Sequence, residues 1–367
     1  MANSFITIKE IARLALPRLI ENLVFPNLVY KDYSNDFVKG KGAKIQVRKP
    51  VVLTAQDFNP ATGTTAQDVK EDSVEVTLDR FATVDVAFSD IEMAVNVDDL
   101  TRLYIEPAAV ALAQKINADG LELYKDIPYA TGTAGTTPSS IGAFADARKL
   151  LNTHKVPVEG RKALWDPEAD AKFSQIEAIL NAEKSGSTEA LRNGSIGRVM
   201  GFDNYMSQAV KTHANGTMAS MAVDGAVSEG ATVIHVDGGT GTETVTKGTI
   251  ITISGVNYTV TEDAVCTGGE CDLNVYPAVP AAIKDNTAVT ITAGHTANLV
   301  FNPNAFAFVT RPLAAPSGVE SYVTSYNGLT LRVVKGYDMK YKREMLSMDI
   351  LYGYKTMYPE MAARVLG

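Results

Sequence analysis

The chain has 367 residues, of which 46% are hydrophobic and 8% aromatic, and this composition excludes an intrinsically disordered protein. Its formal net charge is -8, from 34 basic and 42 acidic residues. Because neutralising phosphates requires clustered Lys and Arg, this balance argues against a protein whose task is to grip nucleic acid.

The first segment, residues 5–30, has the apolar spacing of an amphipathic helix, with expected breaks at Pro17 and Pro26. Charged residues such as Lys9 and Glu10 interrupt the apolar positions, so no signal-peptide core is present. No apolar run in the chain approaches the ~20 residues that a membrane span requires. We therefore expect a soluble protein that is made in the cytoplasm and does not enter a membrane.

Residues 74–88 alternate between apolar and polar side chains, which predicts one strand of 15 residues. At ~3.3 Å per residue, this strand would extend roughly 50 Å. Paired with a strand at 45–53, it would form a ribbon too long to bury its apolar face on itself, so we expect a neighbouring subunit to cover it. The alternative is two shorter strands with a bulge at Arg80–Phe81, folded flat on the same domain.

The residues expected at this intersubunit contact lie on the ribbon and in the polar loop 54–73 at its tip. They are Asp57, Phe58, Asn59, Val74, Val76, Leu78, Arg80 and Phe81.

A long helix is predicted next, because apolar residues recur at helical spacing from Ile105 to Ile127 after possible caps at Asp98 and Asp99. From Pro107 onward it would span ~30 Å, which would make it the longest helix of the chain. A mixed α/β region follows, with helices expected at 141–152 and 167–184 and a strand at Arg161–Trp165. Acidic residues after Trp165 favour the start of the second helix through its dipole and need no acid–base role.

Residues 223–297 are rich in Thr, Val and Gly and differ from the helical patterns before them. After them the chain resumes with an apolar strand at 298–311 that cannot stand alone. This order predicts a small β barrel or sandwich inserted into a larger α+β domain. Its strands are expected at Ala231–Val236, Thr249–Ile253, Tyr258–Thr261, Leu273–Tyr276 and Ala288–Thr292.

The sequence offers no arrangement of residues that indicates catalysis. Cys266 and Cys271 are read as two reduced thiols beside a turn, since cytosolic disulfides are rare and zinc needs four ligands; a disulfide formed later, outside the cell, is the alternative. The loop Asp237–Glu243 fits a hairpin turn better than a calcium loop or a phosphate cradle. The four histidines show no metal-ligand spacing and are read as structural or surface residues: His154, His213, His235 and His295. We therefore expect no catalytic, cofactor-binding or metal-binding residues, and no enzyme.

Two stretches resemble the major capsid protein of tailed bacteriophages. The first is Gly194-Ser-Ile-Gly-Arg-Val-Met-Gly-Phe-Asp203, and the second runs from Tyr337-Asp-Met-Lys-Tyr-Lys through Met348-Asp-Ile-Leu-Tyr-Gly353 to Tyr358-Pro-Glu360. The β insert is similar to the insertion domain of the Salmonella short-tailed phage type of coat protein, most of all at Lys247–Val256. The order of elements matches as well, and the resemblance covers nearly the whole chain.

The resemblance implies an α+β protein of the tailed-phage capsid (Johnson) fold. Its parts would be an N-terminal arm at 1–38, an extended loop at 39–92, a spine helix at 93–127, an axial domain at 128–222 with 298–317, the inserted barrel-like domain at 223–297, and peripheral-domain strands at 318–367.

The resemblance also implies a function. Copies of the chain would form hexamers and pentamers of an icosahedral shell in the host cytoplasm, around a scaffolding protein, with a portal protein and possibly a decoration protein as partners. The shell would mature and enclose double-stranded DNA without sequence-specific binding, and the chain would end in the virion capsid.

Three alternatives remain, of which the first is a related shell protein and the other two come from different classes. An encapsulin-like nanocompartment shell shares the fold but encloses enzymes. An enzyme with an inserted carbohydrate-binding-like β module would need a pocket of convergent polar groups, which the sequence does not show. A secreted surface-layer protein or adhesin would need a signal peptide.

Overall fold

The protein is described by a computed structural model over most of its length. The described residues are 8–31, 44–49, 55, 60, 73–89, 104–181, 189–219, 221–326, 328–340 and 343–367. Asp98 and Asp99, the expected helix caps, and Asp57, Phe58 and Asn59 in the loop lie outside these residues.

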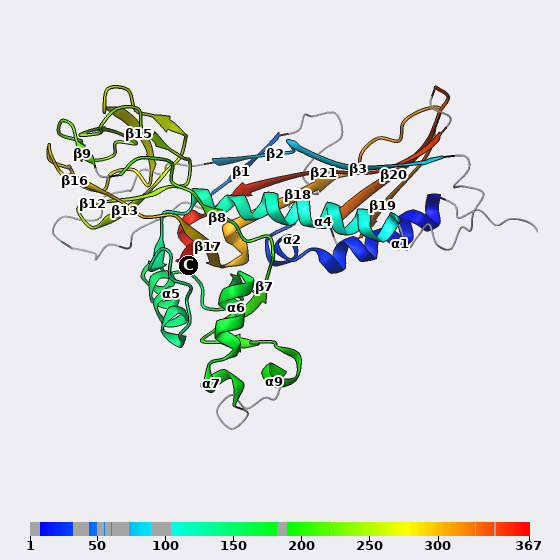
Figure 1. Ribbon diagram of the computed structural model, residues 1–367, viewed down its shortest axis with the longest axis horizontal. Helices are drawn as coiled ribbons and strands as arrows, with labels where there is room; N and C mark the ends of the chain where they lie inside the picture. The colour runs from blue at the N-terminus through cyan, green and yellow to red at the C-terminus, as the bar shows by residue number, and fades with distance from the viewer. Residues whose placement is uncertain are drawn as a thin grey trace, which may run out of the picture.

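One long helix, α4 (Glu106–Leu121), runs along the body of the molecule beside a five-stranded sheet (Figure 1). It confirms the predicted long helix, and it continues as the 3₁₀ helix η4 (Glu122–Asp126). Leu112 and Ile116 of its apolar stripe are buried in the main hydrophobic core. Gly120 allows Phe25 to pack directly on the helix, because a Cβ at that position would lie 2.5 Å from the Phe25 Cδ1 atom.

The N-terminal segment forms α1 (Ile8–Asn22) and α2 (Phe25–Leu28). The expected break at Pro17 is wrong, because α1 continues through this residue. A proline inside a helix costs about 3 kcal/mol. Burial of the apolar face of α1 against α4 and the sheet offsets this cost. Pro26 lies in the first turn of α2, where its missing N–H breaks no helical hydrogen bond.

The five-stranded antiparallel sheet is built around its longest strand, β21 (Arg343–Thr356). Three strands pair with it: β3 (Arg80–Ser89), β20 (Leu329–Asp338) and β18 (Phe306–Arg311). The fifth strand, β19 (Glu320–Tyr326), pairs with β20.

The predicted 15-residue strand is wrong, because the chain divides it into β2 (Ser73–Thr77) and β3. Only β2 belongs to a two-stranded ribbon, with β1 (Lys44–Arg48), while β3 joins the sheet of its own chain. The break falls at residues 78–79, where β2 crosses β21 at Gly353; a Cβ at Gly353 would collide with the Thr77 carbonyl oxygen. The structure therefore has two shorter strands, although the break precedes Arg80–Phe81.

A second sheet carries the middle of the chain. Its buried central strand is β17 (His295–Phe301). The single apolar strand expected at 298–311 is wrong, because the 3₁₀ turn Pro303–Ala305 divides it into β17 and β18, which belong to different sheets. In sheet order the strands are β4 (Ala130–Gly132), β22 (Ala362–Leu366), β17, β5 (Lys162–Trp165), β7 (Phe202–Met206) and β6 (Arg198–Val199), and β8 (Thr212–His213) also pairs with β17.

Helices pack on this second sheet as the sequence indicates in part. The predicted helix at 141–152 is α5 (Ile141–Thr153). The helix predicted at 167–184 is instead α6 (Pro167–Ser174) followed by the single turn α7 (Glu177–Leu180), and α9 (Glu189–Asn193) comes later. Asp166 caps α6 by accepting hydrogen bonds from the backbone amides of residues 168 and 169, which confirms that these carboxylates serve the helix start.

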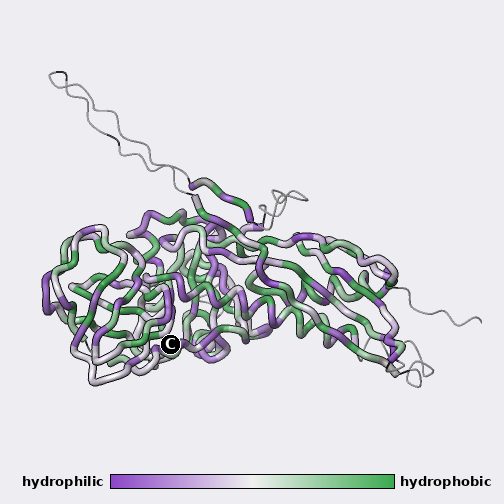
Figure 2. The backbone as a smooth tube through the Cα atoms, turned by 90° about the horizontal axis from the view of Figure 1, so that it is seen from above, coloured by the Kyte–Doolittle hydropathy of each residue, from purple (hydrophilic) through white to green (hydrophobic). Residues whose placement is uncertain are grey.

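The insert contains a closed six-stranded antiparallel barrel, at the left of Figure 1. All five expected strands are present, as β10 (Val233–Asp237), β12 (Ile250–Ile253), β13 (Val256–Val260), β15 (Cys271–Tyr276) and β16 (Ala288–Ile291). The sixth strand, β9 (Met221–Val223), was not predicted; it pairs with both β10 and β16 and so closes the barrel. The buried residues of the barrel form a hydrophobic core of their own. Along the chain, hydrophobic and hydrophilic stretches alternate in the barrel and in the sheets (Figure 2).

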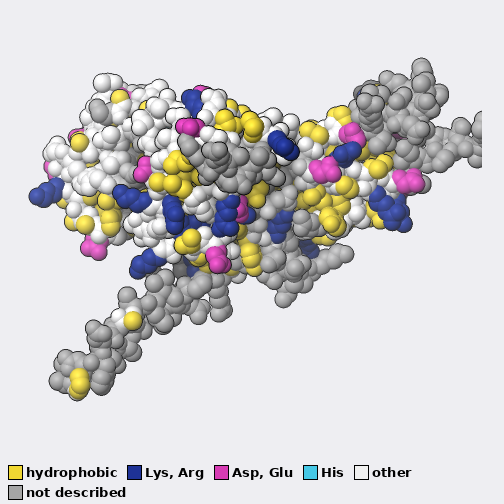
Figure 3. All heavy atoms as spheres, turned by 90° about the horizontal axis from the view of Figure 1, so that it is seen from below, with side chains coloured by type: hydrophobic (Ala, Val, Ile, Leu, Met, Phe, Trp, Pro, Cys, Tyr) yellow, Lys and Arg dark blue, Asp and Glu magenta, His cyan; other side chains and the backbone are white. Residues whose placement is uncertain are grey.

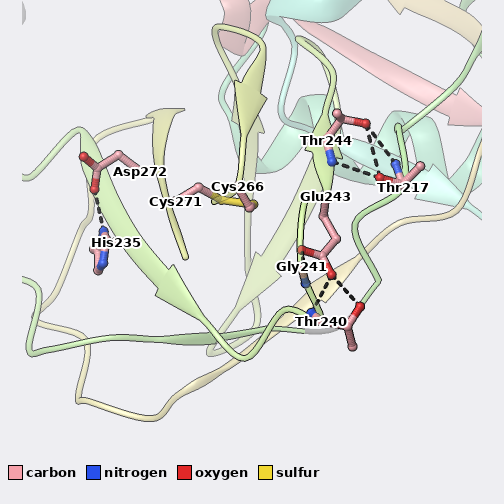
Figure 4. Close-up of a disulfide and its surroundings, with 9 residues drawn as sticks. All are labelled: Thr217, His235, Thr240, Gly241, Glu243, Thr244, Cys266, Cys271 and Asp272. Atoms are coloured by element: carbon pink, nitrogen blue, oxygen red, sulfur yellow. Dashed lines mark hydrogen bonds and ion pairs between the residues drawn. A yellow bond between two sulfur atoms is a disulfide. The ribbon is translucent and has the colours of Figure 1, made fainter. Parts of the chain in front are cut away.

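The two cysteines lie at the edge of the barrel and form a disulfide, so the expectation of two reduced thiols is wrong (Figure 4). Their loop packs on the loop Asp237–Glu243, which is held by its own carboxylate: Glu243 accepts hydrogen bonds from the backbone amides of Thr240 and Gly241. Gly239 and Gly269 join the two loops through a backbone hydrogen bond of 3.0 Å. The expected hairpin turn is wrong, because β10 before this loop and β11 (Thr244–Val245) after it belong to different sheets and do not pair with each other.

Candidate assembly surfaces

A charge cluster buried in the body holds the start of β3 against α4. The Asp119 carboxylate of α4, only 7% exposed, accepts a 2.6 Å hydrogen bond from the Tyr352 hydroxyl of β21. It also forms ion pairs with Lys115 Nζ at 2.8 Å and Arg80 Nη1 at 3.3 Å. Helix, sheet and the first residue of β3 are therefore fastened at one carboxylate.

The surroundings of Asp119 act on its pKa in opposite directions. Burial favours the neutral acid, but hydrogen bonds from Lys115 and Tyr352 and the charge of Arg80 together hold its pKa below the ordinary value. A carboxyl group whose pKa is depressed on folding stabilises the protein above its unfolded pKa. That contribution is lost as the pH falls through the folded value.

We expect Asp119→Asn to lower the free energy of unfolding at pH 7 by about 1–3 kcal/mol, because it removes the charge that satisfies Arg80 and the Tyr352 hydroxyl. Urea unfolding at pH 7 measures this. The difference from wild type should shrink as the pH falls through the depressed folded pKa of Asp119, where the wild-type carboxyl is itself protonated. Glu75→Gln, which breaks the exposed Lys44–Glu75 pair, is the matched control and should cost about 0–1 kcal/mol. Equal costs for the two variants would contradict the role of the buried cluster.

The structure places the five described residues of the predicted contact set differently from one another. Val76 and Leu78 are buried within the same chain, in a small core with Ala307, Val309 and Met357. Their side chains are therefore covered without a neighbouring subunit. Val74 is half-buried beside the same core. Arg80 belongs to the Asp119 cluster, and Phe81 is 52% exposed. Contact of any of them with another subunit stays a prediction, for which Phe81 has the most accessible apolar side chain.

A second apolar surface, not predicted from the sequence, lies on the lobe formed by α6, α7, α9, β6 and β7, which projects below the sheets in Figure 1. Its exposed members come from three separate segments, and Leu191 of α9 is 68% exposed. The exposed apolar residues of this lobe are Leu180, Leu191, Met200, Tyr205 and Met206. Single exposed apolar residues are normal, whereas a contiguous patch of them is typical of an interaction site.

A third apolar surface lies at the far end of the five-stranded sheet, where β20 turns into β21. Met339 is 76% exposed there, and Tyr337 and Val319 are also exposed. Seen from below, hydrophobic side chains gather in several patches along the molecule, with Lys and Arg side chains between them (Figure 3). The molecule thus presents apolar surface at separated places rather than in one pocket.

Charge is distributed unevenly between barrel and body. Residues 221–291 contain nine Asp or Glu and two Lys, a formal net charge of -7 out of -8 for the whole chain. The remaining residues are nearly neutral in sum, so the barrel is the acidic part of the molecule.

The described residues show no group of three or more His, Cys, Asp or Glu that can hold a metal ion. In the same part of the chain, no helix is long and apolar enough to cross a membrane. Two of the four histidines are buried: His213 lies between the Tyr124 hydroxyl at 3.0 Å and the Thr249 hydroxyl at 3.2 Å, and burial lowers its pKa to about 3. His235 is exposed and pairs with Asp272 at 2.7 Å. These are structural contacts.

Residues 240–367 match the family model of the P22 coat protein, gene protein 5. Among solved structures, the chain is similar to one from Mycobacterium phage Che8, with 19% identity and a TM-score of 0.54, covering 94% of this chain and 90% of that one. It is also similar to the capsid structure of the cyanophage P-SCSP1u, with 16% identity and a TM-score of 0.51, covering 94% of this chain and 88% of that one. No curated protein matches the sequence.

The family match begins inside the barrel and continues to the last residue, and the structural similarity extends over 94% of the chain. Together they confirm the resemblance to the major capsid proteins of tailed phages, whose fold this chain has and whose P22 coat protein family its residues 240–367 match.

Proposed function

We propose that the chain is the shell-forming subunit of a tailed-phage capsid and that its work is self-association. The single observation that supports this most is the fold, which is shared with a phage capsid structure over 94% of the chain. The family match adds to it, because a match that begins at residue 240, within the barrel, favours a phage coat protein over a nanocompartment shell.

Copies of the chain would associate as hexamers and pentamers of an icosahedral shell. The separated apolar surfaces at Phe81, around Leu191 and around Met339 fit this proposal, because a closed shell gives each copy several different neighbours. Each of these surfaces is small. Weak contacts suit assembly, because they let misplaced subunits dissociate.

The parts would follow the boundaries expected from the family, with one change. The inserted domain would begin at or before Met221 rather than at 223, since β9 belongs to the barrel. The axial part would then contain the lobe with Leu191, and the peripheral part the sheet end with Met339.

The remaining partners would be a scaffolding protein, a portal protein and possibly a decoration protein, and shells would assemble in the host cytoplasm and mature as DNA enters. The acidic balance of the chain supports a wall that encloses double-stranded DNA without binding it tightly.

Deleting residues 54–73 tests the proposal that the tip of the extended loop joins neighbouring subunits. The purified full chain, with an assembly chaperone if needed, should form shells visible in electron micrographs. The deletion variant should keep the wild-type circular dichroism and melting transition but sediment as small species. Wild-type protein that stays a compact monomer at high concentration would contradict the proposed function. Intact shells from the deletion variant would contradict only the role of the loop tip.

A further inference from the structure

A fully buried arginine without a carboxylate partner lies where the barrel meets the body. Arg364, on β22, is 0% exposed. Its Nη1 donates to the Gly248 carbonyl of the barrel at 2.7 Å, and its Nη2 donates to the Thr259 hydroxyl of the barrel at 3.0 Å and to the Lys125 carbonyl of η4 at 3.3 Å. Within the described residues, no Asp or Glu oxygen lies within ion-pair distance of the guanidinium, and its Nε has no hydrogen-bond partner.

Burying a guanidinium in this way is costly for folding. An ion removed from water without a counter-ion loses several kcal/mol of hydration, which hydrogen bonds to neutral carbonyls recover only in part. Burial lowers the pKa of Arg364 to about 9, which leaves the side chain charged at neutral pH. The Tyr124 ring, 5.2 Å from the guanidinium carbon, adds a cation–π contact. Buried polar groups of this kind can specify one geometry at the expense of stability.

The surroundings of Arg364 fit closely. Gly248 has φ +95° and packs against Lys125, where a Cβ would lie 2.7 Å from the Lys125 Cγ atom. The Thr259 hydroxyl donates to the Lys125 carbonyl at 2.8 Å, which links the barrel to η4 by a direct hydrogen bond beside the arginine. His213 links Tyr124 of η4 to Thr249 of the barrel in the same layer.

Other contacts at this junction are weaker. Lys247 of the barrel pairs with Asp126 at 3.6 Å, and both side chains are substantially exposed, so this pair contributes little. Beside the junction is a cleft of about 430 Å³; Glu122, Lys211, His213, Lys247 and Asp263 are among the residues that line it. The barrel and the body are therefore not in close contact over this part of the junction.

We propose that Arg364 is a positioning residue that fixes the angle of the barrel on the body. Its side chain joins the last strand to three other segments: η4 at the end of α4, and the two barrel segments at Gly248 and Thr259. This consequence for a shell rests on the proposed function: every copy in the shell would present its acidic barrel in the same direction. The contacts of the barrel with neighbouring copies would then have one geometry.

Five variants of the full chain test this proposal, of which Arg364→Lys is the conservative one. Arg364→Met keeps the apolar length but removes every donor. Gly248→Ala keeps the arginine, but its Cβ would push the barrel away from Lys125 and displace the carbonyl to which Arg364 donates. Lys247→Gln removes the exposed ion pair at the same junction and serves as the matched control. Val260→Ala weakens the barrel core, where Val260 is fully buried, and serves as the stability control.

Small-angle X-ray scattering of monomers reports the orientation of the barrel. Electron cryomicroscopy of shells gives two further readouts, the sharpness of the barrel density and the distribution of shell diameters. We expect Arg364→Met and Gly248→Ala to change the scattering of the monomers, to make the barrel density less sharp and to broaden the distribution of shell diameters. Arg364→Lys should restore all three readouts in part. Lys247→Gln and Val260→Ala should match wild type in all three readouts, although Val260→Ala should melt at a lower temperature.

Wild-type barrel density and scattering in both Arg364→Met and Gly248→Ala would overturn the proposal. If Arg364→Met does not fold, Gly248→Ala decides alone. If wild-type protein forms no shells, the proposed function fails, and the scattering of monomers still decides whether Arg364 sets the angle.

Discussion

Replacing Leu112 by Pro is expected to unfold the body of the protein. Leu112 lies in the middle of α4 and is buried in the main core. Proline there removes one helical hydrogen bond and clashes with the preceding turn, which costs about 3 kcal/mol or more. Losing the leucine side chain adds about 2–5 kcal/mol. The sum approaches the 5–15 kcal/mol of stability typical of a whole domain.

Two control variants separate these contributions. Leu112→Ala keeps the backbone and should cost about 2–5 kcal/mol through packing alone. Ala111→Pro, at the exposed neighbouring position, should cost about 3 kcal/mol through the backbone alone. Urea unfolding followed by circular dichroism at 222 nm measures all three. An unchanged midpoint for Leu112→Pro would mean that α4 does not support the core.

A fragment of residues 214–293 is expected to fold on its own, and a fragment of 223–297 is not. The two differ in β9, whose residues Met221 and Ala222 pair with β10 on one side and β16 on the other. Without them the barrel opens and exposes two strand edges. Met218 and Met221 are buried in the barrel core, and losing each forfeits about 1.5–3 kcal/mol of burial. A domain of this size, at about 0.1 kcal/mol per residue, has little more than that in total.

Thermal melts of the two fragments, followed by circular dichroism, check this expectation. The longer fragment should melt cooperatively, and the shorter one should show no transition. Met221→Ala in the longer fragment is an intermediate case and should melt at a lower temperature. Identical melts for the two fragments would show that β9 is not needed for closure, and a flat melt of the longer one would show that the barrel depends on the body.

The sequence by itself determined the features that depend on local periodicity. Five barrel strands and α4 repeat apolar residues at a spacing of two or of three to four, because each element buries one face. The acidic start of α6, which Asp166 caps, depends on neighbouring residues as well and was predictable.

The tertiary structure alone decided those features whose interacting residues come from segments far apart in the sequence. The alternation at 74–88 is the same for one strand and for two, and the division at 78–79 follows from the crossing of β2 over β21 at Gly353. Pro17 remains helical because α4 and the sheet cover the apolar face of its helix. Local helix propensity does not include this tertiary packing. Arg364 has the sequence context of an ordinary surface arginine, yet its hydrogen-bond partners lie 105 to 239 residues away. Periodicity records which face of an element is buried, whereas the identity of the burying partner is set by long-range packing.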